Sequence, residues 1–146
     1  MNELSYYTLA RADPTFIHQH LVDAYAAQHL RVSKSTIGAA FALTGLYLAV
    51  ERGFTGRQVQ RMHILMAKRS KHWPAFIPPA DVGPLTVADV HKVEPGPRRD
   101  EALLAWCASV WGAWSPEHER VREMVESISL NLPGPSRHDR RRARGT

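Results

Sequence analysis

The sequence predicts an all-α protein, a compact bundle of about five to six helices, on two observations. Six segments can be drawn as helices with an apolar face, and no segment shows the strict alternation of a strand. Residues that typically start or stop a helix separate these segments. A length of 146 residues allows one domain that buries most of its apolar surface without disulfides. We therefore expect short connections, with consecutive helices as antiparallel neighbours.

Three helices are expected in the first half of the chain. Asp13 is a suitable N-cap for the first helix, and Pro14 is a suitable first residue. Ser33 or Ser35 can cap the second helix, which Gly53 ends because glycine readily adopts a left-handed conformation. The expected ranges are 14 to 29, 33 or 35 to 52, and 56 to about 71.

A proline-rich segment, HWPAFIPPADVGP, separates the third and fourth expected helices. It contains four prolines and is therefore expected to be irregular. Its apolar side chains Trp73, Phe76 and Ile77 predict an ordered loop that lies over the bundle. If these side chains do not pack on their own bundle, they can form an interface with another chain, and a homodimer is one such arrangement.

Three further helices are expected in the second half of the chain. Thr86 and Asp89 have the spacing of a capping box, which would start a short fourth helix. Ser115 and Pro116 combine an N-cap with a proline at the first position of the sixth. The expected ranges are 86 to about 90, 98 or 100 to 114, and 116 to about 130.

The formal charge of +5 comes mainly from the last ten residues. This segment, RHDRRRARGT, contains five arginines and one aspartate and has no apolar residue able to anchor it. The sequence therefore predicts one helical domain, residues 1 to 132, followed by a disordered basic tail, residues 133 to 146. Nucleic acid is expected to bind only weakly, through the arginine-rich tail.

Cysteine content and the first residues of the chain predict a cytoplasmic protein. Cys107 is the only cysteine, and residues 1 to 20 lack the pattern of a signal peptide. The longest apolar stretch, residues 37 to 50, is shorter than the ~20 residues that a membrane span needs. Cys107 lies among apolar residues, and its burial would keep the thiol neutral and unreactive.

Candidate functional residues lie in the stretch FIHQHLVDAYAAQH, within the first expected helix. At 100° per residue, His18 and His29 fall on the apolar face of this helix, together with Tyr25. Gln28 is adjacent to His29. A polar group left unpaired on such a face costs about 1–3 kcal/mol, so these four residues are candidates for a catalytic site.

The three histidines of this stretch do not form one cluster. His20 projects to the opposite face, near Asp23, and is expected to contact solvent or that carboxylate. His18 and His29 are about 16 Å apart along the helix axis. Two ligands of one metal must lie within ~4 Å of each other. Each of these two histidines could therefore contribute only to a separate site, completed by other helices.

Glu117 and His118 open the sixth expected helix, one turn above its apolar stripe. A carboxylate and an imidazole in this position can serve as metal ligands or as an acid/base pair. They can equally be a residue that favours the helix N-terminus and a surface group. Helical bundles build metal sites from inward histidines and glutamates, so zinc, iron or manganese is a candidate cofactor. The candidate ligands are His18, His29, Glu117 and His118.

Several motifs of large enzyme classes are absent from the sequence. It contains no Cys-x-x-Cys pair, His-Glu-x-x-His motif, Walker loop, dinucleotide-binding glycine fingerprint or Gly-x-Ser-x-Gly elbow. The enzyme classes that depend on these motifs are therefore not expected.

Two stretches resemble a known family. HQHLVDAYAAQH follows the pattern His-x-x-x-Val-Asp-Ala-Tyr-x-x-Gln-His, and SVWGAWSPEH follows Ser-Val-Trp-x-Ala-Trp-Ser-x-x-His. With LTGLYLAVERG and LTVADV, they resemble a bacterial family of small proteins known only as a domain of unknown function, over about residues 16 to 122. The resemblance implies no activity, substrate or cofactor. It marks His18, Asp23, Tyr25, Gln28, His29, Trp114 and His118.

The candidate residues support two interpretations of function. In the first, the protein is a small-molecule enzyme with His18, His29 or His118 as metal ligand or general base, while Tyr25 and Gln28 orient the substrate. In the second, the same residues form a structural hydrogen-bond network in a non-catalytic module that binds a ligand or a partner. The two differ in whether another imidazole or carboxylate lies within ligand distance of these histidines.

Overall fold

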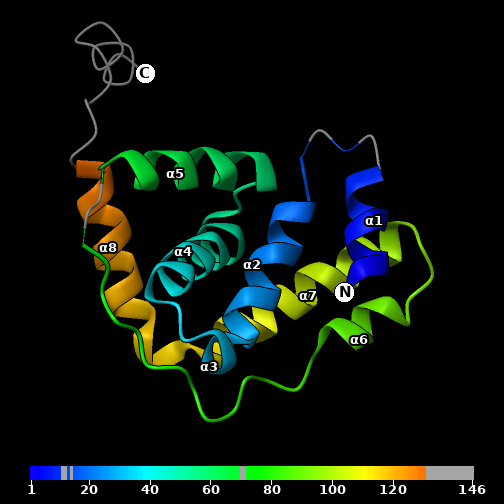
Figure 1. Ribbon diagram of the computed structural model, residues 1–146. Coiled ribbons are helices and arrows are strands. Elements are labelled where there is room, and N and C mark those ends of the chain that lie inside the picture. The colour runs from blue at the N-terminus through cyan, green and yellow to red at the C-terminus, as the bar shows by residue number, and fades with distance from the viewer. Residues whose placement is uncertain (11–12, 14, 70–71, 131–146) are drawn as a thin grey trace, which may run out of the picture.

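The computed structural model describes residues 1–146 except 11–12, 14, 70–71 and 131–146. This part of the chain is all-α and contains no strand, as predicted (Figure 1). The expected tail and the expected first helical residue, Pro14, lie outside the described residues.

The helices and their bounds are as follows. They are α1 (Asn2–Ala10), α2 (His18–Gln28), α3 (Leu30–Ser33), α4 (Thr36–Arg52), α5 (Gly56–Arg69), α6 (Val87–His91), α7 (Pro97–Ala113), the 3-10 helix η1 (Ser115–Glu117) and α8 (His118–Leu130).

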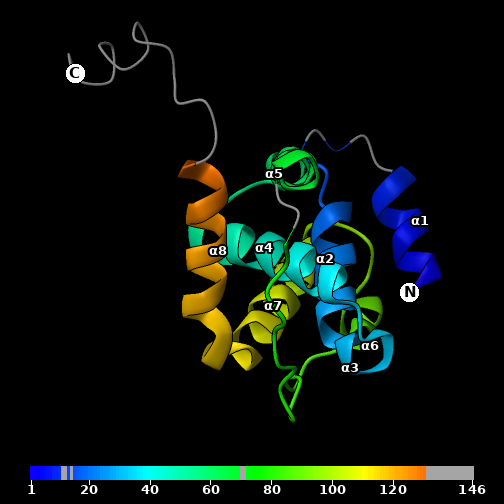
Figure 2. The same cartoon turned by 60° about the vertical axis from the view of Figure 1, so that its left-hand side comes forward.

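Helix α4 lies at the centre of the bundle. It packs against α2, α5, α7 and α8, and Figures 1 and 2 show these four helices around it. Its apolar residues are distributed around most of its circumference, so it can bury side chains against all four neighbours. Leu43 and Leu46 of α4 form the core with Leu21 of α2 and Trp106 of α7, all fully buried. None of the described helices is both long enough and apolar enough to cross a membrane.

Local sequence signals set the ends of α4 and α6. The Ser35 hydroxyl accepts a hydrogen bond from the Gly38 N–H at 2.9 Å, which caps the start of α4. Gly53 ends α4 with a positive φ of 67°, as expected. Thr86 and Asp89 form the expected capping box at the start of α6.

The N-terminal part of the chain differs from the expectation. Helix α1 was not anticipated, because few of its residues are buried and its sequence lacks a clear apolar face. The helix expected from residue 14 begins only at His18. Phe16 adopts a left-handed conformation with φ 58°, which interrupts a helix. Asp13 caps the turn before α2 instead, where its carboxylate accepts the N–H of Ile17 at 3.0 Å.

The proline-rich segment contains no regular structure between residue 72 and the start of α6. It passes along one side of the bundle, from the end of α5 to α6 (Figure 1). Its three large apolar side chains differ in exposure. Phe76 is buried, Trp73 is half-buried, and Ile77 is 76% exposed.

Candidate functional site

His18, the first residue of α2, forms a hydrogen bond with Thr8 of α1. Its Nδ1 lies 2.8 Å from Thr8 Oγ1. The Thr8 hydroxyl also lies within hydrogen-bond distance of the carbonyls of Leu4, at 2.9 Å, and Ser5, at 3.1 Å. Burial lowers the pKa of His18, which favours the neutral ring. His18 therefore connects α1 to α2.

His29 follows α2 directly and stacks on Tyr25. The two ring centroids are 4.1 Å apart, with an angle of 26° between the ring planes. His29 Nδ1 lies 2.7 Å from the Tyr25 carbonyl. A carbonyl oxygen can only accept, so Nδ1 carries the proton. The pair therefore closes the last turn of α2.

Gln28 is buried at the end of α2 and uses both N–H groups of its amide. Its Nε2 donates to the carbonyl of Leu85 at 2.7 Å and to that of Val82 at 3.2 Å. Its Oε1 accepts the indole N–H of Trp106 at 3.1 Å. Gln28 thus joins α2 to α7 and to the proline-rich segment. Its role in this structure is to position that segment.

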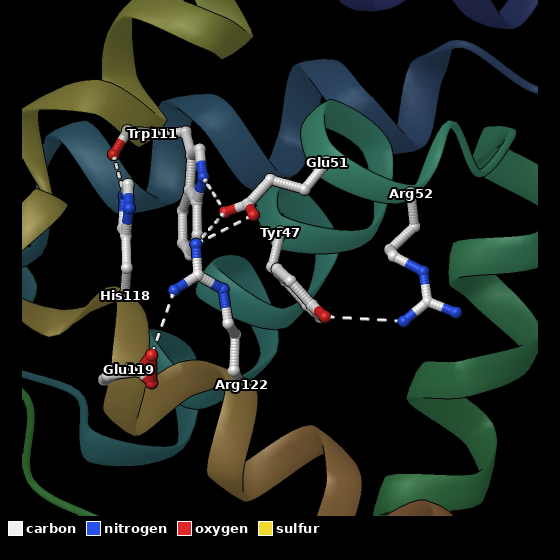
Figure 3. Close-up of polar contacts among 7 residues, drawn as sticks. All are labelled: Tyr47, Glu51, Arg52, Trp111, His118, Glu119 and Arg122. Atoms are coloured by element: carbon white, nitrogen blue, oxygen red, sulfur yellow. Dashed lines mark hydrogen bonds and ion pairs between the residues drawn. The ribbon is translucent and has the colours of Figure 1, made fainter.

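His118 belongs to a polar cluster between α4, α7 and α8, which we call the Trp111 cluster: Glu51, Trp111, His118 and Arg122 (Figure 3). The rings of His118 and Trp111 are stacked, with centroids 3.8 Å apart, and His118 Nε2 donates to the Trp111 carbonyl at 2.7 Å. The Trp111 indole N–H donates to Glu51 at 2.8 Å. Arg122 donates to both carboxylate oxygens of Glu51, at 2.8 and 3.1 Å. The cluster therefore connects the end of α4 to α7 and α8.

The charge state of Glu51 follows from these contacts. Burial opposes its ionisation, but the hydrogen bonds from Arg122 and Trp111 outweigh burial, and the pKa of Glu51 lies below its ordinary value. Next to the cluster, Arg52 donates to the hydroxyl of Tyr47 at 3.5 Å (Figure 3). Because of its lowered pKa, the Glu51 carboxylate is ionised at neutral pH, and it is paired with the guanidinium of Arg122.

Glu117 and Arg120 hold the proline-rich segment from the side of α8. The buried Glu117 accepts the N–H of Ile77 at 2.9 Å and pairs with Arg120 at 2.7 Å. Arg120 donates to the carbonyl of Ala75 at 3.0 Å, and its guanidinium lies 5.1 Å from the ring centre of Phe76. Residues 75 to 77 are therefore fixed in place by two side chains of the η1–α8 region.

The predicted metal ligands are not brought together. His18 lies at the start of α2 and His29 directly after its end, while Glu117 and His118 lie where η1 meets α8. Within the described part of the chain, no group of three or more histidine, cysteine, aspartate and glutamate residues is placed to hold a metal ion. The four residues lie in separate environments, and metal binding stays a prediction.

Of the two expected neighbours of His20, solvent or the Asp23 carboxylate, solvent is wrong. His20 and Asp23 are only 5% and 3% exposed. Helix α2 packs against α1, α4, α5 and α7, so more than one of its faces is buried. A projection that assumes one buried face and one exposed face therefore does not describe this helix. Burial lowers the pKa of His20 and raises the pKa of Asp23 well above its ordinary value, which favours the neutral form of both.

This buried region also contains polar atoms without a hydrogen-bond partner among the described residues. They are His20 Nδ1, Asp23 Oδ2 and Thr44 Oγ1. Cys107 lies close by, and its thiol donates to the carbonyl of His20 at 3.6 Å. Burial raises the pKa of the Cys107 thiol, and the nearby Asp23 adds to the shift. The thiol is therefore neutral, which agrees with its expected low reactivity.

A cavity of about 380 Å³ lies between α3, the start of α4 and residues 75 to 78. The buried side chains of Leu30, Ala39 and Phe76 give it an apolar lining. Arg31 and Lys34 also line it, and both are exposed. Neither cation forms an ion pair with a described residue. The cavity thus combines apolar surface with two cations that lack a carboxylate partner in this part of the chain.

Lys34 has an unusual backbone conformation for its residue type. It ends α3 in the left-handed region, with φ 53° and ψ 21°. Glycine is the common residue in such a position, because a side chain there costs about 1–2 kcal/mol. The backbone conformation therefore does not explain why a lysine occurs at this position of the cavity lining.

None of the residues predicted to form a site lines this cavity, but two of them support it. Gln28 fixes the proline-rich segment at residues 82 and 85, and Glu117 fixes it at Ile77, which is part of the cavity wall. A sequence signal for the cavity was present where α3 meets α4, because Arg31, Lys34, Ser35 and Thr36, two cations and two hydroxyls, lie within six residues. This signal was not recognised, because its significance depends on the distant residues 75 to 78.

Comparison with known proteins places the chain in a family without assigning an activity. No curated protein and no solved structure matches it. The model of a family of unknown function, DUF5946, matches residues 1–115, a range that includes the whole lining of the cavity. The protein therefore belongs to this family of unknown function, DUF5946.

Proposed function

We propose that the protein is a non-catalytic module that binds a small anionic molecule with an apolar part. The observation that carries this proposal is the cavity between α3, the start of α4 and residues 75 to 78, which has an apolar lining and two cations. Its volume of about 380 Å³ is in the range of small-molecule sites.

The lining suggests how such a ligand would be bound. An aromatic or short aliphatic group would contact Leu30, Ala39 and Phe76, where each Å² of apolar surface removed from water contributes roughly 25 cal/mol. A carboxylate, sulfonate or phosphate would lie near Arg31 and Lys34. Charge-assisted hydrogen bonds from these cations would orient the ligand.

The contacts of the candidate catalytic residues favour binding over catalysis. His18, His29 and His118 each form a hydrogen bond through one ring nitrogen with a different part of the fold, and both N–H groups of Gln28 are used in holding the proline-rich segment. A general acid or base must lie within reach of the group that it protonates or deprotonates. These side chains are instead dispersed over α2, its C-terminal end and α8. We therefore propose the binding role in place of the enzyme.

Two fluorescent probes test this proposal. Anilinonaphthalene sulfonate carries an anion and an apolar ring system, whereas N-phenyl-1-naphthylamine has the same rings without the sulfonate. We expect saturable binding of the sulfonate by the folded protein, with weaker binding of the neutral probe. Thr36→Trp places a large side chain at an exposed position of the lining and should abolish binding of both probes.

Charge variants separate the two parts of the site. Arg31→Gln with Lys34→Gln should weaken binding of the sulfonate at least tenfold and change binding of the neutral probe less than threefold. Lys92→Gln with Arg98→Gln, at two exposed positions outside the cavity, is the matched control for the loss of two charges. Circular dichroism verifies that each variant is folded. Equal binding of the sulfonate by the wild type and the Thr36→Trp variant would contradict the proposal.

A further inference from the structure

The chain contains a second basic segment besides the arginine-rich tail. Residues 52 to 80 contain six lysines and arginines and no aspartate or glutamate. The last ten residues contribute +4 of the net charge of +5 and residues 52 to 80 contribute +6, so the other parts of the chain together carry a net charge of −5. The positive charge outside the tail is therefore concentrated in one segment, and four of its six cations lie in α5.

Three of the four cations of α5 are aligned on its outer side. Arg57, Arg61, Ile64 and Lys68 are spaced by four, three and four residues, which places them on one face of a helix. All four are exposed, and we call them the outer stripe. The helix lies across one end of the bundle, where its outer side is accessible (Figure 1). The sequence contains no acidic residue from 52 to 80 that could neutralise the stripe from within this segment.

The opposite face of α5 is attached to the bundle. Val59 and Met66 are fully buried, and α5 packs against α4 and α2. His63 Nε2 donates to the carbonyl of Phe41 in α4 at 2.8 Å, and the two rings are in an edge-to-face contact with centroids 5.1 Å apart. The apolar face of α5 is therefore not available to insert into a lipid bilayer, and Ile64 is the only large apolar residue of the outer stripe.

We propose that the outer stripe of α5 binds the phosphate backbone of a nucleic acid. The stripe extends from Arg57 to Lys68, eleven residue steps or about 16 Å along the helix axis. A strand of duplex DNA places one phosphate per about 3.4 Å of axis, so the stripe faces roughly five phosphates of one strand. Contacts of this kind carry affinity without reading the base sequence.

The position of α8 adds to this argument. In both views the last turn of α8 reaches the end of the bundle at which α5 lies (Figures 1 and 2). The end of α8 at Leu130 therefore lies at the same end of the bundle as α5. The sequence that follows contains the five arginines of the tail. Binding through α5 is nevertheless a separate proposal from binding through the tail, and variants can distinguish the two.

Fluorescence anisotropy of a labelled 20-base-pair DNA duplex, titrated with the full-length protein, tests the proposal. Arg61→Glu with Lys68→Glu reverses two charges of the stripe, and both side chains are exposed. We expect at least a tenfold loss of affinity in 50 mM salt. The slope of log K against log salt concentration should decrease in magnitude by about two, because two phosphate contacts are lost.

A matched variant controls for the change in net charge. Lys92→Glu with Arg98→Glu reverses two exposed charges outside α5 and should change the affinity less than threefold. A tail variant, Arg140→Gln with Arg141→Gln and Arg142→Gln, should retain binding that still depends on Arg61 and Lys68. Equal losses in the two charge-reversal variants would overturn the proposal, and so would a loss that follows the tail variant alone.

Vesicles test the other polyanionic surface. Phosphatidylcholine vesicles with 30% phosphatidylserine should bind the protein more weakly than the duplex does under the same salt conditions. If the protein binds these vesicles more tightly than the duplex, and the α5 variant loses only vesicle binding, the assignment to nucleic acid is wrong.

Discussion

The carboxyl group of Asp23 occupies the space that a side chain at position 45 would need. A Cβ atom built on Gly45 would lie 1.9 Å from Asp23 Oδ2 and 3.2 Å from a methyl group of Val59. Asp23 belongs to α2 and Gly45 to α4, so the absence of a side chain on α4 lets a buried carboxyl lie between the two helices. Gln19 donates to the other carboxyl oxygen at 3.1 Å.

Gly45→Ala should therefore destabilise the protein. The new methyl group overlaps with a fully enclosed carboxyl, and overpacking of this kind costs about 1–3 kcal/mol. Chemical denaturation measures the change in the free energy of unfolding. Gly112→Ala is the matched control, because nothing lies within 4 Å of a Cβ at this helical position. The control should stabilise the protein by about 0.5–1 kcal/mol.

A double-mutant cycle attributes the effect to this contact. In the background of Asp23→Ala, the carboxyl is gone and Gly45→Ala has room for its methyl group. The loss in the free energy of unfolding caused by Gly45→Ala should be at least about 1 kcal/mol smaller in this background than in the wild type. If Gly45→Ala is equally destabilising in both backgrounds, the overlap with Asp23 is not the cause.

Asp23 should also make stability fall as pH rises. Burial raises its pKa in the folded state, so the native protein keeps this proton where the unfolded chain has lost it. The unfolded state then binds fewer protons, and the free energy of unfolding decreases by about 1.4 kcal/mol per pH unit between the two pKa values. Below about pH 4 the difference in the free energy of unfolding between the wild type and Asp23→Asn should be constant. Above about pH 4 the wild type should become progressively less stable relative to Asp23→Asn.

Denaturation of the two proteins from pH 3 to pH 8 measures this difference. His20 titrates in the same range, but it is present in both proteins, so its contribution largely cancels in the comparison. Asp81→Asn, at an exposed position, is the control and should give no such trend. A difference that does not vary with pH would mean that Asp23 ionises with an ordinary pKa in the folded protein.

Local signals in the sequence predicted the helix ends that depend on local chemistry. Ser35 and Gly53 bound α4 as expected, because a cap needs only neighbouring backbone groups. Helix α1 could not be predicted in this way. Only Leu4 and Thr8 of this helix are buried, and its position against α2 depends on tertiary contacts such as that of Thr8 with His18.

The candidate site was less predictable than the fold. The sequence identified Gln28 and Glu117 as unusual residues, and both are engaged in several hydrogen bonds. Their roles depend on residues 77, 82 and 85, which are 40 to 57 positions away. No spacing rule within one helix contains that information. The burial of His20 depends in the same way on the helices that surround α2.

Gln28→Ala should destabilise the protein and loosen the proline-rich segment. The change removes two hydrogen bonds to the carbonyls of Val82 and Leu85 and leaves the buried indole N–H of Trp106 without its acceptor. We expect a loss of about 2–4 kcal/mol in the free energy of unfolding. Amide hydrogen exchange should accelerate at residues 80 to 86 more than in α4.

Two variants test the specificity of this effect. Gln60→Ala, on α5, removes only a contact with exposed Arg57 and should change stability by less than about 0.5 kcal/mol. Gln28→Glu retains an acceptor for Trp106 but directs carboxylate oxygens at two carbonyls, so it should be more destabilising at pH 8 than at pH 4. A loss below about 0.5 kcal/mol in Gln28→Ala would show that the segment is held by other contacts.

Glu51 should give stability a pH dependence of the opposite sign to that of Asp23. The hydrogen bonds from Arg122 and Trp111 overcome the effect of burial and lower its pKa, so the folded state releases this proton at a lower pH than the unfolded state does. Its contribution is therefore present above the ordinary pKa and is lost as pH falls through the folded value. Glu51→Gln should cost about 0.5–1 kcal/mol at pH 7 and little below pH 3. Denaturation at both pH values, with Glu126→Gln as an exposed control, measures the effect. A loss that persists undiminished at low pH would mean that the amide disturbs the packing of Trp111 and that the ion pair contributes little.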